Sequence, residues 1–284
     1  MSNQNLENFS FKKYAWNQFK KDKIALICLY LLFLLIGIAV LAPVIANERP
    51  LYAEYKGYTL YPAFSSESRT DSIFKENGSL EEVLQYDITD WRTLDFKKVV
   101  WPLIPYSPEG MDRYNRDYVS PNGKQRFKNA EGLITDVPKK FRHHLGTDGI
   151  GRDLASGLIH GTRISLMVGL VSMGIASLIG IFLGALAGSK VGSAIDRITS
   201  AFAVISSSFP VWWIGMLMIF LFAFTYHIFP ARATPSMLPT EPGYILALLY
   251  HMTLPLITIV MIGFGAWAYL VRNFMVGTMQ EDFI

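Results

Sequence analysis

The chain has 284 residues, of which 51% are hydrophobic and 17% charged, and its 26 basic and 23 acidic residues give a formal net charge of +3. Because soluble domains average about a quarter charged residues, this composition excludes an ordinary soluble globule, and an aromatic content of 14% excludes a disordered chain. The charge is uneven: residues 47–163 carry 17 basic and 17 acidic side chains and the rest only 9 and 6, which leaves no basic stripe for nucleic acid.

Four uncharged runs are long enough to cross a bilayer, which takes about 20 apolar residues. They are Ile24–Asn47, Ile164–Ser189, Ile198–Ala231 and Pro242–Val271. The first run exceeds the apolar region of about 7–15 residues that a signal peptide has, so we interpret it as an uncleaved helix. We therefore expect transmembrane helices at residues 24–46, about 164–188, 199–226 and 244–271.

The lysines that precede the first run predict the orientation. Short segments beside a span set topology, and basic ones stay in the cytoplasm. Five lysines lie just before the run: Lys12, Lys13, Lys20, Lys21 and Lys23. Residues 1–23 should thus be cytoplasmic and residues 47–142 external, while residues 190–197 form an inner loop and residues 232–241 an outer connection.

The external segment predicts an irregular α+β domain. Lys56-Gly57 lies between two aromatic runs within Leu51–Tyr61, a pattern typical of a hairpin. Ser79–Tyr86 has a capping-box pattern, with Ser79 followed three residues later by Glu82, which favours one short helix. The aromatic side chains should hold this domain together.

The second run carries small residues four positions apart: Ser172, Ala176, Gly180, Gly184 and Gly188. In a helix they share one face and allow a close approach of another helix. Two interpretations stay open at this point. The stripe packs within the chain, or it packs against another chain.

The third and fourth runs each contain a proline. Pro210 follows the hydroxyls of Ser206–Ser208, which can bond to the backbone carbonyl that proline leaves without a donor. We expect a kink there and a similar one at Pro255. His251 lies several residues inside the fourth run, and an ionisable group at that depth is a candidate for the transport path or a partner of a neighbouring helix.

The most specific string runs from His143 to Asp153 and leads into the second run. Its glycines permit tight turns, Asp148 or Asp153 is suited to capping a helix, and Arg152 is suited to pairing with a carboxylate. An acid/base role for the two aspartates is the weaker alternative. His143 and His144 lack further metal ligands at suitable spacing, so we expect no metal site. The single Cys28 also excludes an intrachain disulfide framework.

This string resembles a known family. The pattern His-x-Leu-Gly-Thr-Asp-x-x-Gly-Arg-Asp, followed by Gly-x-Arg-x-Ser at a helix start, is similar to the second permease subunit of oligopeptide and dipeptide ABC importers. The residues that carry it here are His143, Gly146, Thr147, Asp148, Gly151, Arg152, Asp153 and Arg163. The resemblance implies a helical membrane permease of the MetI-like (type I importer) fold, with residues 143–284 as its membrane domain and residues 47–142 as an enlarged external insertion.

The resemblance also implies partners and a location. Such a subunit works with a second permease, two ATPase subunits and an external solute-binding protein, and carries peptide-like substrates across the bacterial inner membrane. No P-loop is present, because Gly188-Ser189-Lys190 follows Gly184 too closely, so ATP should be bound by another chain. We expect no catalytic residue and no cofactor in this chain, lipid around it, and no nucleic-acid partner.

The last residues resemble the entry to the cytoplasmic coupling loop of this family, which docks on the ATPase subunit. They include Glu281, Asp282 and Phe283. Relatives continue with a coupling helix and two further spans, so we expect a truncated gene product that is incomplete at its C-terminus, with a genuine four-span protein as the alternative. A second departure from the family is Ile228–Arg232, which is more similar to the partner permease.

Two rival functions remain. A membrane-anchored receptor or assembly protein would share the topology but would not account for the Gly146–Asp153 string. A membrane-embedded hydrolase would need Ser206–Ser208 to meet His251, and no nucleophile-elbow pattern supports it.

Overall fold

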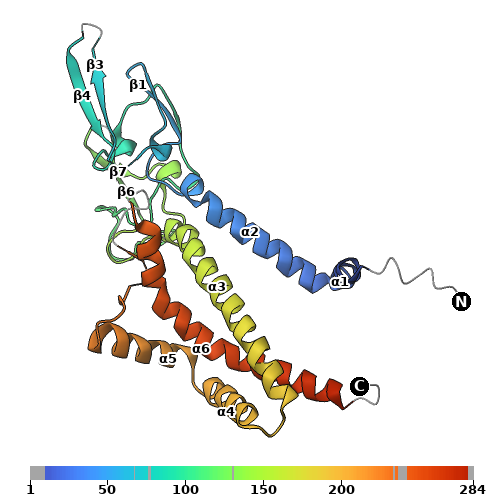
Figure 1. Ribbon diagram of the computed structural model, residues 1–284. Helices are drawn as coiled ribbons and strands as arrows, with labels where there is room; N and C mark the ends of the chain where they lie inside the picture. The colour runs from blue at the N-terminus through green and yellow to red at the C-terminus, as the bar shows by residue number, and fades with distance from the viewer. Residues whose placement is uncertain are drawn as a thin grey trace, which may run out of the picture. The chain divides into compact units, whose positions relative to one another are not determined.

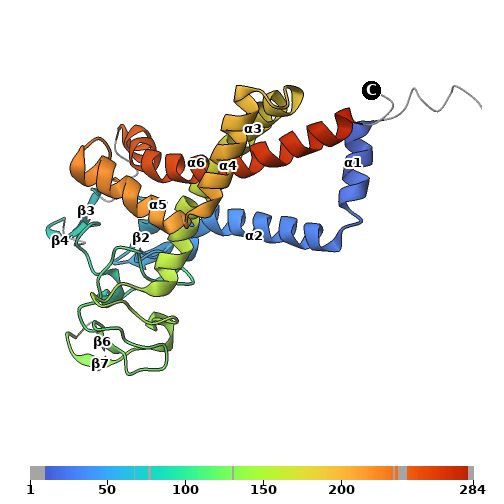
Figure 2. The same ribbon diagram turned by 90° about the horizontal axis from the view of Figure 1, so that it is seen from below.

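The computed structural model describes residues 10–66, 68–75, 78–129, 131–232, 234–235 and 242–280. The chain forms two compact units, Met1–Ile164 and Ser165–Ile284. Figures 1 and 2 trace the chain through both units, and each unit is described by itself below.

The first unit begins with two helices, α1 (Phe11–Phe19) and α2 (Lys23–Ile45). Asp22 separates them: its backbone is extended, and its side chain accepts hydrogen bonds from the first backbone N–H groups of α2. α2 has 23 residues and is apolar on every side, as expected for a helix surrounded by lipid. At 1.5 Å per residue it extends about 35 Å, enough to cross a bilayer.

Among the residues that the structure describes, seven short strands follow α2. They are β1 (Tyr52–Tyr55), β2 (Tyr58–Leu60), β3 (Thr70–Phe74), β4 (Leu80–Gln85), β5 (Lys98–Val100), β6 (Arg126–Lys128) and β7 (Ile134–Asp136). One antiparallel sheet has the order β2-β1-β5, and β3-β4 and β6-β7 form separate antiparallel pairs. A small core joins the first sheet to the β3-β4 pair, and Tyr55, Tyr86 and Trp91 are its aromatic members. Its buried residues are Ala53, Tyr55, Leu60, Ile73, Leu84, Tyr86 and Trp91.

The expected hairpin at Leu51–Tyr61 is confirmed. Tyr55 pairs with Tyr58 across a two-residue turn. Lys56 and Gly57 both have positive φ angles, 46° and 84°. That combination is the type I′ turn, whose twist matches that of the strands it joins.

The helix expected at Ser79–Tyr86 is wrong, because this segment forms strand β4. Leu84 pairs with Asp71 of β3 and is buried in the core. The glutamate of the capping-box pattern, Glu82, does not turn back on its own backbone but bonds to Tyr55 Oη at 2.8 Å and to Lys56 Nζ at 3.0 Å. Contacts between strands thus override a local helix signal.

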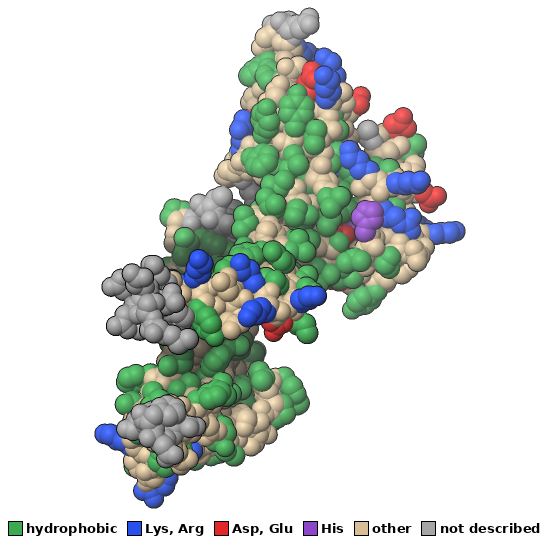
Figure 3. Space-filling model, turned by 90° about the vertical axis from the view of Figure 1, so that its right-hand side faces the viewer, with side chains coloured by type: hydrophobic (Ala, Val, Ile, Leu, Met, Phe, Trp, Pro, Cys, Tyr) green, Lys and Arg blue, Asp and Glu red, His purple; other side chains and the backbone are tan. Residues whose placement is uncertain are grey.

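The helices of the second unit are long and apolar. α3 (Leu154–Ser189) begins in the first unit and continues into the second, where α4 (Ala194–Ser208), α5 (Val211–Met218) and α6 (Tyr244–Met279) follow. Among the described residues, α2, α3 and α6 are each long and apolar enough to cross a membrane. Large hydrophobic side chains are exposed along these helices, among them Leu178, Phe182 and Leu246, which suits contact with lipid. Figure 3 shows one face of the molecule, with hydrophobic side chains over both its helical and its strand-rich parts.

α3 and α6 are longer than a bilayer requires. Each has 36 residues and extends about 54 Å, against a hydrocarbon core of about 30 Å. α3 starts ten residues before its uncharged run, and α6 continues past Val271 through the charged Arg272. Their polar ends are therefore suited to the membrane surfaces.

The kink expected at Pro210 is confirmed, and it is a sharp bend that divides residues 199–226 between two helices. α4 and the following helix, which continues as a π-helical segment over Ile219–Thr225, meet at an angle of 96°. Phe209, which precedes Pro210, is extended, because proline disfavours the helical conformation in the residue before it. Ser207 and Ser208 donate their hydroxyls to the carbonyl of Val204 in the last turn of α4, and not to the Ser206 carbonyl that Pro210 leaves without a donor.

α3 and α6 approach closely along the glycine stripe. A Cβ atom added to Gly184 would lie 2.5 Å from the carbonyl oxygen of Ala268, and one added to Gly188 would lie 2.6 Å from Met275 Cβ. Gly180 continues this face one turn earlier and meets the same helix. Within this unit the stripe is therefore occupied by α6, as expected for small residues in membrane helices.

Candidate functional site

The string His143–Asp153 folds around the buried side chain of His143. His143 has no exposed surface. Its Nδ1 lies 2.8 Å from Asp153 Oδ2, and its Nε2 lies 3.2 Å from Asp112 Oδ2. Because ionised carboxylates only accept hydrogen bonds, both ring nitrogens donate, and the imidazole is held in its charged form.

The pKa values of this cluster follow from the same contacts. Burial lowers the pKa of His143, but the bonds to Asp112 and Asp153 outweigh burial and raise it above the ordinary value of 6.5. Burial raises the pKa of Asp112, but bonds from His143, Asn115 and the Tyr114 backbone lower it below 3.8. The His143 ring also stacks on Tyr106, with ring centroids 3.9 Å apart.

Asp153 caps helix α3, as the sequence suggested for either aspartate. Its Oδ1 accepts a hydrogen bond of 2.6 Å from the backbone N–H of Ser156. Its other oxygen binds His143, so one carboxylate joins the start of α3 to the buried histidine. Asp148 instead pairs with Arg152 at 2.8 Å, an ion pair across one turn of the string.

Two glycines of the string are required by the backbone. Gly146 and Gly151 have φ angles of 80° and 89°, a conformation that costs energy for residues with a side chain. A Cβ atom on Gly151 would overlap the carbonyl oxygen of Asp112, and one on Gly146 would overlap that of Val119. The string therefore packs tightly against residues 112–119.

The remaining residues of the string have different surroundings. Thr147 is buried and its hydroxyl donates to the carbonyl of Asn115 at 2.7 Å. Arg163 is exposed on α3, one turn beyond His160, whose Nε2 donates to the carbonyl of Ala46 at the end of α2. Within the described residues no group of His, Cys, Asp and Glu is suited to a metal ion. The cluster therefore has the geometry of a structural contact. Both ring nitrogens of His143 are bonded to carboxylates, so neither has a free lone pair that could accept a proton or bind a metal.

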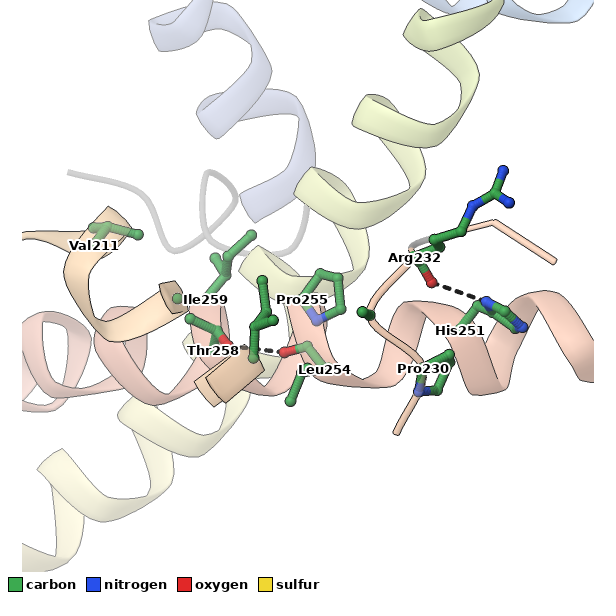
Figure 4. Close-up of a pocket in the computed structure, with 11 residues that line it drawn as sticks. Val211, Pro230, Arg232, His251, Leu254, Pro255, Thr258 and Ile259 are labelled. Carbon is green, nitrogen blue, oxygen red and sulfur yellow. Dashed lines mark hydrogen bonds between the residues drawn. The ribbon is translucent and has the colours of Figure 1, made fainter. Parts of the chain in front are cut away.

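His251 lines a cavity of about 310 Å³ in the second unit, shown in Figure 4. Its Nδ1 donates to the carbonyl of Arg232 at 2.8 Å. The other walls are mostly apolar and come from α5, the π-helical segment, the residues that follow it, and α6: Val211, Gly215, Ile219, Pro230, Ala231, Leu254, Pro255, Thr258 and Ile259. An apolar cavity with a few polar groups is typical of small-ligand sites.

A contact that the sequence analysis missed lies at the other end of α6. Arg272 Nε and Nη2 lie 2.8 Å and 3.1 Å from the two carboxylate oxygens of Asp196, at the start of α4. The backbone N–H of Gly192 also donates to Asp196. One signal was available: Asp196 is the single acidic residue between Asp153 and Glu241. Asp112 carried no comparable signal, since it lies 31 residues before His143.

The expected coupling-loop entry, Glu281, Asp282 and Phe283, lies outside the described residues. Its role stays a prediction. The last described residue of that region is Gln280, two turns after Arg272.

Two family models match the chain. "N-terminal TM domain of oligopeptide transport permease C" matches residues 10–62, and "binding-protein-dependent transport system inner membrane component" matches residues 180–284. The first match includes α1 and α2, and the second includes α4 to α6. Over these two segments the chain is similar to the inner-membrane permeases of binding-protein-dependent transport systems. The apolar helices and the two matches support a multi-pass membrane protein.

Curated relatives agree with this family. The peptidoglycan transport permease YejE of Agrobacterium fabrum is 26% identical over 219 residues, covering 72% of this chain and 55% of the relative. The YejE inner membrane permease of Escherichia coli is 25% identical, covering 72% and 54%. The dipeptide permease DppC of Lactococcus lactis is 28% identical, covering 71% and 47%. The chain spans about half the length of these relatives.

Proposed function

We propose that this chain forms part of the translocation path of an ATP-driven importer for peptides. The observation that carries the proposal is the pair of family matches, which include α2 near one end and α4 to α6 at the other. The substrate class follows from the relatives, whose names refer to dipeptides, oligopeptides and peptidoglycan. These ligands share the peptide bond, so we assign a peptide rather than one particular solute.

In this proposal the chain crosses the membrane four times, through α2, α3, the bent pair α4–α5 and α6, with its N-terminus in the cytoplasm. Residues 47–142 form an external α+β insertion. The lysines before α2 support this orientation, because basic residues beside a span stay in the cytoplasm. The His143 cluster then lies at the external base of α3 and holds the insertion to the start of that helix.

The partners follow from the same family. A solute-binding protein would deliver the peptide, a second permease would complete the path, and two ATPase subunits would bind ATP. Transport then requires helix bundles that rock around a central site. ATP shifts this equilibrium only by binding one state more tightly than the other. We assign the His251 cavity to the path as a candidate, since its walls are apolar and it has few polar groups.

Peptide uptake in living cells tests the function. A strain that lacks the gene should lose uptake of at least one labelled member of a set that includes a dipeptide, an oligopeptide and a peptidoglycan fragment. The wild-type gene should restore uptake, and depletion of ATP should abolish it. Undiminished uptake of every member of the set in the deletion strain would contradict the proposal.

A further inference from the structure

Helix α1 is a separate element in front of the first span. Lys21 and Asp22 donate their backbone N–H groups to Gln18 and Phe19, which closes the end of α1. The extended backbone of Asp22 then interrupts the helix before α2 begins at Lys23. Figures 1 and 2 show that α1 runs crosswise to α2.

α1 has an apolar side with no protein partner among the described residues. Phe11, Ala15 and Phe19 are spaced four residues apart and share one face of the helix. Trp16 extends this face and stacks on Phe19, with ring centroids 5.5 Å apart. Phe11 is 73% exposed and Trp16 is 49% exposed, and no residue of α1 is buried.

The charges around α1 are almost all of one sign. Between Ser10 and Lys23 the chain has five lysines and one acidic residue, Asp22. Lys13 and Lys20 lie on the side of the helix opposite Ala15, and Lys20 Nζ lies 5.7 Å from the centre of the Trp16 ring. Lys12 lies beside the aromatic face, between Phe19 and Trp16. An aromatic face flanked by lysines is typical of helices that lie at a membrane surface.

The position of α1 in the chain identifies what covers its apolar side. Three residues separate it from α2, and three residues reach at most about 11 Å. If α2 crosses the bilayer, α1 therefore lies at the bilayer surface. A helix crosswise to a spanning helix lies along that surface. The lysines complement the negative charge of anionic lipid headgroups.

We propose that α1 is an interfacial anchor that binds an anionic lipid surface. Phe11, Ala15, Trp16 and Phe19 enter the boundary between headgroups and acyl chains, and the lysines bind the headgroups. This anchor fixes the depth of α2 in the bilayer. The inference goes beyond transport and requires only that α2 lies in the membrane.

Fluorescence quenching in the full chain tests the anchor. In a Cys28→Ser background, Ala15→Cys and Asn17→Cys place an environment-sensitive dye on opposite sides of α1. The protein is reconstituted in phosphatidylcholine vesicles with and without phosphatidylglycerol. With phosphatidylglycerol, we expect brominated lipid to quench the dye at residue 15 several-fold more than the dye at residue 17. Acrylamide in the water should show the reverse order.

Three results would overturn the proposal. The first is equal quenching by acrylamide at both positions. The second is no loss of lipid quenching at residue 15 when Lys12, Lys13 and Lys20 are all replaced by glutamine. The third is shielding of residue 15 only after ATPase subunits are added, since the partner would then be a protein. A dye on the native Cys28 of α2, quenched by brominated lipid, shows separately that α2 lies in the bilayer.

Discussion

Arg272 binds both carboxylate oxygens of Asp196, at 2.8 Å and 3.1 Å, and so joins α6 to the start of α4. Two-pronged arginine–carboxylate contacts are among the strongest and most directional in proteins. Arg272 lies two turns before the last described residue of α6, close to the segment expected to enter the coupling loop. The contact is therefore placed to hold the loop before α4 against the end of α6.

Loss of this contact should weaken coupling between ATP hydrolysis and uptake. We expect Asp196→Asn to reduce peptide uptake about tenfold, within the range of known coupling effects, while ATP hydrolysis by the assembled complex falls much less. The exchanged pair Asp196→Arg with Arg272→Asp should recover part of the uptake. Uptake assays with ATPase assays on the same membranes measure this. Wild-type uptake by Asp196→Asn would refute the assignment.

Replacement of His143 should loosen the base of α3. His143→Gln removes the cation that bonds to the buried Asp153 and the half-buried Asp112, and removing one partner of a buried charged group costs about 3–5 kcal/mol. Hydrogen exchange of residues 106–156 in the purified protein should rise sharply. His144→Gln is the matched control, because His144 is exposed and should leave exchange unchanged. Equal protection in the two variants would contradict the role of His143.

The same cluster predicts how stability depends on pH. The raised pKa of His143 contributes stability that is complete below pH 6.5 and is lost as the pH rises through the folded-state value. The lowered pKa of Asp112 contributes stability that is present above pH 3.8 and is lost as the pH falls through its folded-state value. Thermal unfolding of the first unit should therefore occur at the highest temperature between these limits. In His143→Gln the decline above pH 6.5 should disappear, and a decline equal to that of the wild type would be evidence against this cause.

A methyl group in the glycine stripe should push α3 and α6 apart. Gly184→Ala places its Cβ against the backbone of Ala268, and overpacking of this kind costs about 1–3 kcal/mol. Gly174→Ala is the control, because nothing lies within 4 Å of that position. Thermal unfolding in detergent should separate the two variants. If both melt at the wild-type temperature, the packing of these helices differs from the one described.

Much of the helical architecture follows from local sequence. The uncharged runs predict α2, α3 and α6, since burial in lipid needs only length and composition. The turn at Lys56-Gly57 and the Arg152–Asp148 pair are equally local, with partners no more than four residues apart. Composition does not predict the direction in which a helix runs, however. The bend between α4 and α5 depends on the extended backbone of Phe209.

The parts that the sequence did not predict depend on distant residues. Asp112 lies 31 residues from His143, and Asp196 lies 76 residues from Arg272. No periodicity or motif spacing relates positions so far apart. The error at Ser79–Tyr86 has the same origin, because pairing with β3 decides the conformation of β4 and Glu82 bonds outside its own segment.

Labelling from each side of the membrane tests the proposed orientation. In a Cys28→Ser background, Tyr114→Cys should react with a membrane-impermeant reagent in intact cells. Val191→Cys, in the loop before α4, should react only after the cells are opened. Both positions have exposed side chains, so burial does not protect either one. Reaction of both from the same side would contradict the topology.

Native mass spectrometry of gently extracted membranes tests the central claim most directly. The claim is that this chain works as one permease subunit of an ATP-driven importer. We predict a complex that contains one copy of this chain, one other permease and two ATPase subunits, and that loses mass as ATPase subunits dissociate. Recovery of the chain alone, or with partners that include no ATPase, would contradict the account.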